Sequence, residues 1–158
     1  MTHSEIDPIS KEEMELWPSK PLVDLQSPFV DQRGSIQPLV DLMMKSAVMI
    51  ESKAGSLRAN HYHKTDWHYC YVISGKIEYF HRKLNSSKKP ELIIVEQGNM
   101  VFTPPLVEHC MKFPEDTLFL TLSRNPRDQK TYEADVVRVD LIDSSSSITC
   151  LLYTSDAA

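Results

Sequence analysis

The sequence predicts an all-β protein, built as a sandwich or barrel in one domain. Short apolar or alternating runs follow one another from Leu22 onward, and Gly, Pro, Asp or Asn interrupts them about every eight to twelve residues. Helix-length periodic segments are nearly absent between these runs. The length of 158 residues suits one domain with its own core, and 41% hydrophobic and 25% charged residues are typical of a globular chain.

The chain divides into three parts. Residues 1–20 are polar and acidic and are expected to form a loosely ordered arm, while residues 21–143 hold the strands of the barrel. Residues 144–158 begin with a serine run and are expected to be a disordered or non-native tail. Within it, residues 150–158 resemble the translation of a sequencing adapter, so we exclude the tail from the fold prediction.

The expected elements begin with a short helix in the arm, which Ser10 caps and Glu13 joins as the reciprocal partner of a capping box. The strands follow, because each run is rich in β-branched or aromatic residues and is bounded by turn residues. In chain order they are residues 21–26, 35–40, 47–52, 57–63, 68–74, 76–82, 91–96, 100–105, 108–113, 117–123 and 135–142.

Composition excludes several classes of function. The net charge of -5 argues against a nucleic-acid partner, and the run NSSKK is expected to be a solvated hairpin tip. Neither a membrane-spanning run nor a signal peptide is recognisable, so we expect a cytoplasmic protein without a membrane partner. The cysteines lack CxxC spacing, which predicts buried free thiols at Cys70 and Cys110 rather than disulfides or a thiolate zinc site.

Histidines carry the main chemical signal. Three of the six, His61, His63 and His68, lie within eight residues. In an extended strand His61 and His63 share one face, about 7 Å apart. If the next strand pairs with this one as a hairpin, His68 joins them on the inner face. A Pro-Pro turn is expected to deliver His109 from another wall to the same centre, whereas His81 is expected at the surface.

Both histidine segments resemble the two sequence motifs of the cupin superfamily. The first motif has His68 where the family has glutamate, and its matching residues are Gly55, His61, His63 and Gly75. In the second, Leu106 replaces a glycine and Phe113 stands at the place of the final asparagine. Its matching residues are Gly98, Pro104 and His109. The resemblance covers roughly residues 34–122.

This resemblance implies a double-stranded β-helix, the cupin jelly-roll barrel, that binds one divalent transition metal. The implied ligands are His61, His63, His68 and His109. Imidazole-rich sites suit Fe, Mn, Ni, Zn or Cu rather than Mg or Ca, so the identity of the metal stays open. His68 has two possible roles, as a ligand or as a proton donor beside the metal. Asp66 and Glu108 are candidates for orienting an imidazole.

A second, narrower likeness involves SPFVDQRGSIQPLV, residues 27–40. This segment resembles the entry segment of sugar-nucleotide epimerases and ketoisomerases of the same superfamily, and RANHYH resembles their catalytic strand. In those relatives a histidine acts as the base without a metal. The likeness implies an activated sugar as ligand, with Arg33 or Arg58 meeting a phosphate or carboxylate. Trp67 and Phe102 are candidate sugar-stacking residues, with core packing as the alternative.

The function expected from these patterns is a metal-dependent isomerase or epimerase of a sugar or sugar derivative. The metal would polarise a carbonyl or enediolate oxygen, and His68 or Tyr71 would move the proton. Three alternatives stay open: a mononuclear iron dioxygenase, a non-catalytic metal- or ligand-binding module, and a metal-free sugar-nucleotide epimerase or ketoisomerase. The expected partners are a small-molecule substrate, such as a sugar or sugar nucleotide, and a second copy in a homodimer.

Overall fold

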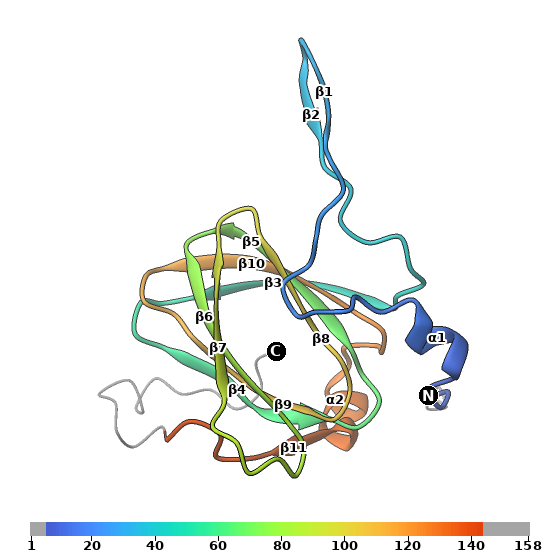
Figure 1. Ribbon diagram of the computed structural model, residues 1–158, viewed down its shortest axis with the longest axis vertical. Helices are drawn as coiled ribbons and strands as arrows, with labels where there is room; N and C mark the ends of the chain where they lie inside the picture. The colour runs from blue at the N-terminus through green and yellow to red at the C-terminus, as the bar shows by residue number, and fades with distance from the viewer. Residues whose placement is uncertain (1–5, 144–158) are drawn as a thin grey trace.

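Antiparallel strands form a barrel in the computed structural model, which describes residues 6–143 (Figure 1). The elements are α1 (Lys11–Glu15), β1 (Phe29–Asp31), β2 (Gly34–Ile36), β3 (Ser46–Ser52), β4 (Leu57–His63), β5 (His68–Ser74), β6 (Lys76–Lys83), β7 (Glu91–Glu96), β8 (Met100–Thr103), β9 (Val107–Lys112), β10 (Thr117–Ser123), α2 (Gln129–Asp135) and β11 (Val136–Arg138). The prediction of an all-β fold is confirmed. The predicted tail, residues 144–158, lies outside the described residues.

The strands predicted from 47–52 through 117–123 are all present with small differences at their ends. The predicted strand 135–142 is wrong for the most part. Asp135 is the last residue of α2, only β11 is extended, and residues 139–142 form no strand. Asp128 caps α2 by accepting a hydrogen bond from the Thr131 N–H at 3.0 Å. Neither α1 nor α2, the helices in the described part of the chain, has the length and apolar run that crossing a membrane requires.

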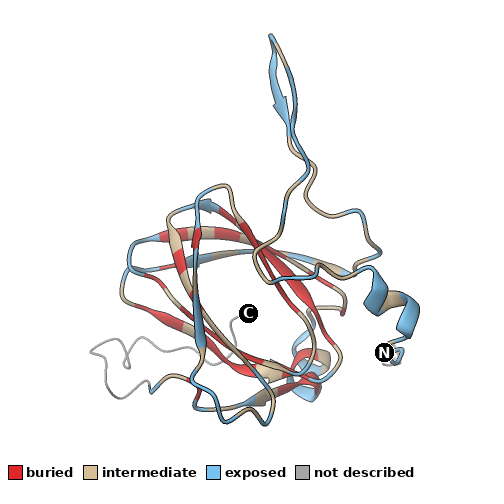
Figure 2. Cartoon of the chain, viewed as in Figure 1, coloured by how far each residue is buried: buried red, intermediate tan, exposed pale blue. Residues whose placement is uncertain are grey.

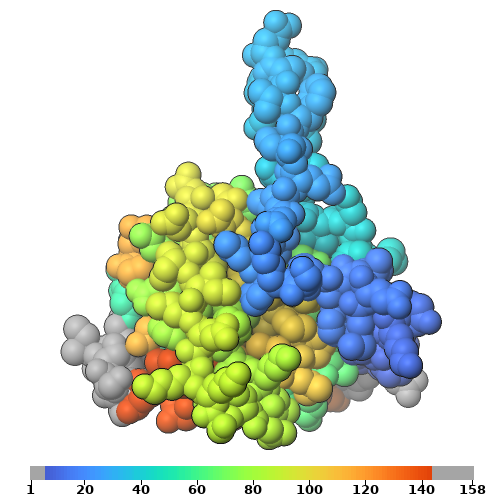
Figure 3. Space-filling model, viewed as in Figure 1, coloured from blue at the N-terminus to red at the C-terminus, as the bar shows by residue number. Residues whose placement is uncertain are grey.

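The first two predicted strands are also wrong in position. Residues 21–26 form only an isolated bridge, between Leu22 and Val101, beside the edge strand β8. In place of 35–40, the short hairpin β1–β2 forms around a turn at residues 32 and 33, which ends at Gly34, whose φ of +135° favours glycine. This hairpin projects away from the barrel (Figures 1 and 3).

Two sheets face each other across the barrel. One has the strand order β3-β10-β5-β8 and the other β11-β4-β9-β6-β7. The predicted hairpin of β4 with β5 is therefore wrong, since the two strands lie in different sheets. Their link cannot act as a tight turn because it is tied to α2, where Asp135 accepts hydrogen bonds from the backbone N–H groups of Thr65 at 2.8 Å and Asp66 at 3.2 Å.

The core occupies the space between the sheets, where Figure 2 shows the buried segments. Its buried residues are Cys70, Val72, Ile77, Tyr79, Val95, Val101, Met111, Phe113 and Phe119. A second cluster lies on the other face of β5 and β8 and consists of Trp67, Tyr69, Met100 and Phe102. Both Cys70 and Cys110 are buried free thiols, as predicted.

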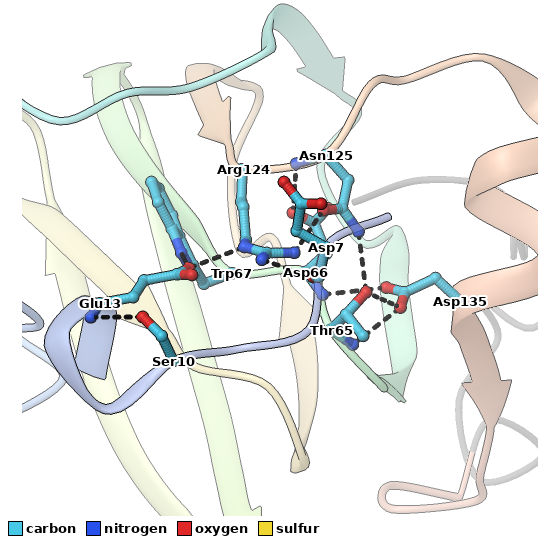
Figure 4. A network of polar contacts seen from close by, with 9 residues as sticks. All are labelled: Asp7, Ser10, Glu13, Thr65, Asp66, Trp67, Arg124, Asn125 and Asp135. Atoms are coloured by element: carbon cyan, nitrogen blue, oxygen red, sulfur yellow. Dashed lines mark hydrogen bonds and ion pairs between the residues drawn. The ribbon is translucent and has the colours of Figure 1, made fainter. Parts of the chain in front are cut away.

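The arm contacts the barrel through α1. Ser10 caps the helix by accepting a hydrogen bond from the Glu13 N–H at 3.1 Å, as predicted. The Glu13 carboxylate serves a different purpose from the expected capping box, because it accepts from Trp67 Nε1 and Arg124 Nε, both at 2.7 Å (Figure 4). Arg124 also donates to the carbonyl of Asp7 at 2.7 Å. These bonds join the arm to the residue before β5 and the residue after β10.

Candidate metal centre

Strand β4 places two imidazoles inside the barrel. His61 and His63 are buried, whereas Tyr62 between them is half-buried, so the alternation expected for the strand is confirmed. An irregularity in the pairing with β9 precedes His61, where Ala59 and Asn60 have φ values of 67° and 62°. The Asn60 amide anchors this bend by donating to the Ile142 carbonyl at 2.9 Å and accepting from its N–H at 3.1 Å.

Strand β9 supplies His109 directly beside them. His109 pairs with His61 across the sheet, and the ring centroids of these two histidines are 4.7 Å apart. The prediction that His109 comes from another wall is wrong, because the turn after β8 carries the chain across to the sheet that contains β4. Leu106, at the position of the motif glycine, adopts a φ of 63°, and its N–H donates to the His63 carbonyl at 2.8 Å.

His68 is the imidazole that arrives from the opposite sheet. It is buried at the start of β5, with its ring centroid 5.5 Å from that of His63 and 5.2 Å from that of His109. Cys70, two residues later on the same face, places its Sγ 3.4 Å from His68 Nδ1. The expected meeting of imidazoles from two walls therefore occurs, with His68 rather than His109 as the contribution of the second wall.

Hydrogen bonds set the tautomers of two of these rings. His63 Nδ1 lies 3.1 Å from Asp135 Oδ2, and His109 Nδ1 lies 3.0 Å from the Val107 carbonyl oxygen. Because both partners are acceptors, each Nδ1 carries the proton and each Nε2 presents a lone pair. Within residues 6–143, the Nε2 atoms of His61, His63, His68 and His109 are buried without a hydrogen-bond partner.

This arrangement fits a transition metal. One nitrogen each from His61, His63 and His109 lies within 4.8 Å of the others, a separation that nitrogens bonded to one metal at about 2.0–2.1 Å can reach with small adjustments. Together with His61 Nδ1, five buried nitrogens of these four rings lack partners among residues 6–143, which is costly unless a ligand engages them, at about 1–3 kcal/mol each. His68 lies outside the group of three, so both of its predicted roles are compatible with the geometry.

Burial keeps His61, His68 and His109 neutral. Desolvation, followed by the charges of neighbouring histidines, lowers the pKa of His61 and His68 well below the usual value. For His109 the same causes lower the pKa to about 3, although the hydrogen bond to Val107 opposes them. Neutral imidazole is the form that binds metals.

Asp135 is the orienting carboxylate that sequence reasoning missed. At the end of α2, it accepts from His63 Nδ1 at 3.1 Å. It also accepts from the hydroxyl of Thr65 at 2.7 Å (Figure 4). Burial raises the pKa of Asp135, but hydrogen bonds from His63 and Thr65 outweigh that effect and lower it overall. A carboxylate on the second nitrogen of a metal-binding histidine is a common arrangement. No sequence signal links the two residues, which are 72 positions apart.

The two predicted orienting carboxylates have other partners. Asp66 accepts from the Asn125 N–H at 2.9 Å, and burial raises its pKa to about 6. Its carboxylate belongs to a second compact group with His63 and Asp135, without a hydrogen bond to the ring. Glu108 pairs with Arg82 at 2.8 Å, because adjacent residues of β9 point to opposite faces and His109 takes the inner one.

Neither the predicted substrate residues nor Tyr71, the predicted alternative proton carrier, gather at the centre. Tyr71 packs with the cluster of Trp67 and Phe102 on the face of β5 and β8 opposite to His68. Arg58 is held at β3, where its Nε donates to Ser52 Oγ at 2.7 Å. Arg33 lies in the projecting hairpin, pairs with its neighbour Asp31 at 2.6 Å, and has an 82% exposed side chain.

Comparisons with solved structures show which fold this is. QdtA, a 3,4-ketoisomerase from Thermoanaerobacterium thermosaccharolyticum in complex with TDP, has a TM-score of 0.60 at 21% identity, over 74% of this chain and 85% of that chain. WlaRB, a TDP-quinovose 3,4-ketoisomerase from Campylobacter jejuni, has a TM-score of 0.63 at 20% identity, over 74% of this chain and 90% of that chain. A dTDP-4-dehydrorhamnose 3,5-epimerase from Sulfolobus tokodaii has a TM-score of 0.60 at 16% identity, over 78% of this chain and 85% of that chain.

The chain thus has the cupin-type jelly-roll fold that the sequence motifs imply. A scan against protein-family models finds no match, and a search of curated proteins finds none either.

Proposed function

We propose that this protein is a metal-dependent isomerase or epimerase that acts on a sugar or sugar derivative. The observation that carries the proposal is the convergence of four buried histidines whose Nε2 atoms lack partners among the described residues. The substrate class is supported by the neighbours in fold, which are ketoisomerases and an epimerase of TDP- or dTDP-linked sugars. A sugar nucleotide is therefore the substrate class that we propose.

The metal would be held by His61, His63 and His109. Their donor set is three imidazole nitrogens, which favours Fe, Mn, Ni, Zn or Cu. When bound, such a metal supplies a Lewis acid for a carbonyl or enediolate oxygen. Asp135 and the Val107 carbonyl keep the Nε2 lone pairs of His63 and His109 directed at the centre, by holding the proton of each ring on Nδ1.

His68 is the group that we assign to proton transfer. Its Nε2 is buried, lacks a hydrogen-bond partner in residues 6–143 and lies on a ring that contacts those of His63 and His109. As a neutral imidazole it accepts a proton from the carbon next to a carbonyl and returns it to the neighbouring carbon or to the other face. The thiol beside it does not compete, because burial raises the pKa of Cys70 to about 12.

Helix α2 limits access of water to this centre. The ring centroid of Tyr132 lies 6.3 Å from that of His61 and 5.9 Å from that of His63. The guanidinium of Arg127 lies 3.7 Å from the centroid of the same tyrosine ring. Excluding water protects a reactive enediolate and strengthens the electrostatic interactions of the site.

The first test is elemental analysis of the purified protein, followed by proton NMR in D₂O with TDP-4-keto-6-deoxyglucose, a ligand found with QdtA. We expect about one transition metal per chain and loss of the proton signal at the carbon next to the keto group. His68→Gln should retain the metal and lose the exchange, since it removes only the proton carrier.

Other results would assign a different function. Exchange in metal-free protein would identify a metal-free isomerase, and oxygen consumption with an iron-loaded sample would identify a dioxygenase. Tight ligand binding without turnover of any sugar nucleotide tested would identify a binding module. Loss of metal in His68→Gln would make His68 a ligand and would remove it from proton transfer.

A further inference from the structure

A groove of about 520 Å³ lies between residues 17–21 of the N-terminal segment and the hairpin formed by β6 and β7. Aromatic side chains from three parts of the chain, Trp17, Tyr79 and Phe102, contribute to its walls. Trp17 and Phe102 face each other with ring centroids 6.0 Å apart. A groove of this volume, with aromatic walls, accommodates an organic ligand of moderate size.

The lining of the groove is strongly basic. The chain has 17 Lys and Arg and a net charge of -5, yet five of these cations line this groove, namely Lys20, Arg82, Lys83, Lys88 and Lys89. Among the described residues that line it, Glu91 is the one carboxylate. Two of the five cations pair with carboxylates outside the lining, Arg82 with Glu108 at 2.8 Å and Lys20 with Asp24 at 3.3 Å, so the basic character of the groove rests on Lys83, Lys88 and Lys89. The segment 85–89, predicted to be a solvated hairpin tip, therefore contributes to a basic surface. Such a field attracts an anion.

Two residues that line the groove each have a buried polar atom without a partner among residues 6–143. These atoms are Trp17 Nε1 and His81 Nε2. The indole N–H can only donate, so its missing partner is an acceptor. The prediction that His81 is an ordinary surface residue is wrong, because its side chain is 15% exposed, stacks on Tyr79 at 5.4 Å and has Nε2 3.7 Å from Glu91, beyond hydrogen-bond reach. Oxygens of an anion match both the indole donor and the lysines.

The groove adjoins the metal centre next to His109. The ring centroid of Tyr79 lies 6.3 Å from that of His109, and His81 pairs with His109 across β6 and β9. Val107, which lines the groove, has the carbonyl that accepts from His109 Nδ1. A ligand anchored in the groove thus lies beside the strand that carries His109.

We propose that this groove binds the phosphate-bearing part of an organic phosphate, with Lys83, Lys88 and Lys89 on its charged oxygens and Trp17 donating to one of them. Three ammonium groups around one groove match the multiple charge of a diphosphate better than that of a single carboxylate. The inference deepens the proposed function by placing the diphosphate of the substrate, and its test is independent of catalysis.

The test is calorimetric titration of the metal-loaded protein with TDP and, separately, with inorganic pyrophosphate. The variant Lys83→Gln/Lys88→Gln/Lys89→Gln is compared with Lys45→Gln/Lys53→Gln/Lys130→Gln, which loses the same charge at exposed positions outside the groove. We expect TDP to bind at least about 30-fold more weakly to the first variant and within about 3-fold of wild type to the second. Trp17→Phe should weaken binding roughly 3- to 10-fold, because one donor is lost while the ring remains.

Equal weakening in the two triple variants, or no binding of TDP to the wild type at millimolar concentration, would overturn the inference. Lysine-dependent binding of TDP in a protein that isomerises no sugar would uphold the groove and reject the proposed function. If the wild type isomerises a sugar nucleotide and the Lys83/Lys88/Lys89 variant binds TDP with unchanged affinity, the proposed function is upheld and the phosphate site in the groove is rejected. Pyrophosphate binding as tight as that of TDP would assign the affinity to the phosphates alone, which supports the phosphate site.

Discussion

The imidazole centre and the β1–β2 hairpin contain residues on which the two sequence likenesses rest, and they differ in burial. The four histidines of the centre are buried where two sheets meet. The hairpin pairs only with itself among the described strands, and its Phe29, Val30 and Ile36 are 60%, 68% and 65% exposed. The spacing of residues in the sequence predicted a site correctly only where neighbouring strands determine which face of each strand is buried.

The largest effect that would break this comparison is expected at His109. Replacing it by alanine removes one of three ligands, so metal affinity should fall by at least about 100-fold, as measured by competition with a chelator. His81→Ala, on the neighbouring strand, is the matched control and should keep the metal. Equal metal loss in both variants would mean that the centre extends along the sheet beyond the group of three.

Asp135→Asn should lower metal affinity by about 10- to 100-fold, because the orienting acceptor of His63 loses its charge. Glu133→Gln is the control on the same helix, since Glu133 pairs with Arg138 at 3.0 Å and does not contact the histidines in any described bond. Unchanged affinity in Asp135→Asn would show that the His63 ring is positioned by packing alone.

Acid should unfold the metal-free barrel through its histidines. The folded-state pKa of His109 is lowered to about 3, so the unfolded chain binds more protons below about pH 6.5. The contribution of neutral His109 to the free energy of unfolding is fully present above pH 6.5 and is lost as the pH falls toward 3. At pH 5 the loss amounts to about 2 kcal/mol. His61 and His68 act in the same direction.

Asp66 opposes this trend, because its raised pKa of about 6 stabilises the folded state as the pH falls. Three histidines outweigh one carboxyl, so urea midpoints should decrease from pH 7 to pH 5. A midpoint that rises over this range would contradict the assignment of neutral buried imidazoles.

The smallest effect is expected in the hairpin. Arg33→Ala removes an exposed ion pair with Asp31, so the urea midpoint should stay at its wild-type value and the metal content should stay constant. Urea denaturation and elemental analysis check both expectations. A metal affinity that depends on Arg33 would mean that the hairpin and the centre are coupled in solution, which the single chain gives no reason to expect.

The strands from β3 to β10 were predictable because each one alternates or forms a short apolar run between turn residues. Two of the site's positions were predictable for the same reason, since His61 and His63 must share a face whatever the strand pairs with. Helix α2 was missed because its seven residues are too short to reveal a helical period. Tyr71 was assigned to proton transfer although its place in β5 puts it on the face opposite to His68.

The sequence by itself determined the extended segments from β3 to β10, which residues within each share a face, and that histidines concentrate in two spaced motifs. Only the tertiary structure decided that β4 pairs with β9, that His68 comes from the opposite sheet, and that Asp135 meets His63 across 72 positions. The physical reason is that side-chain alternation is a local property of one strand. Strand partners and registers depend instead on contacts between distant segments, which a single sequence does not record.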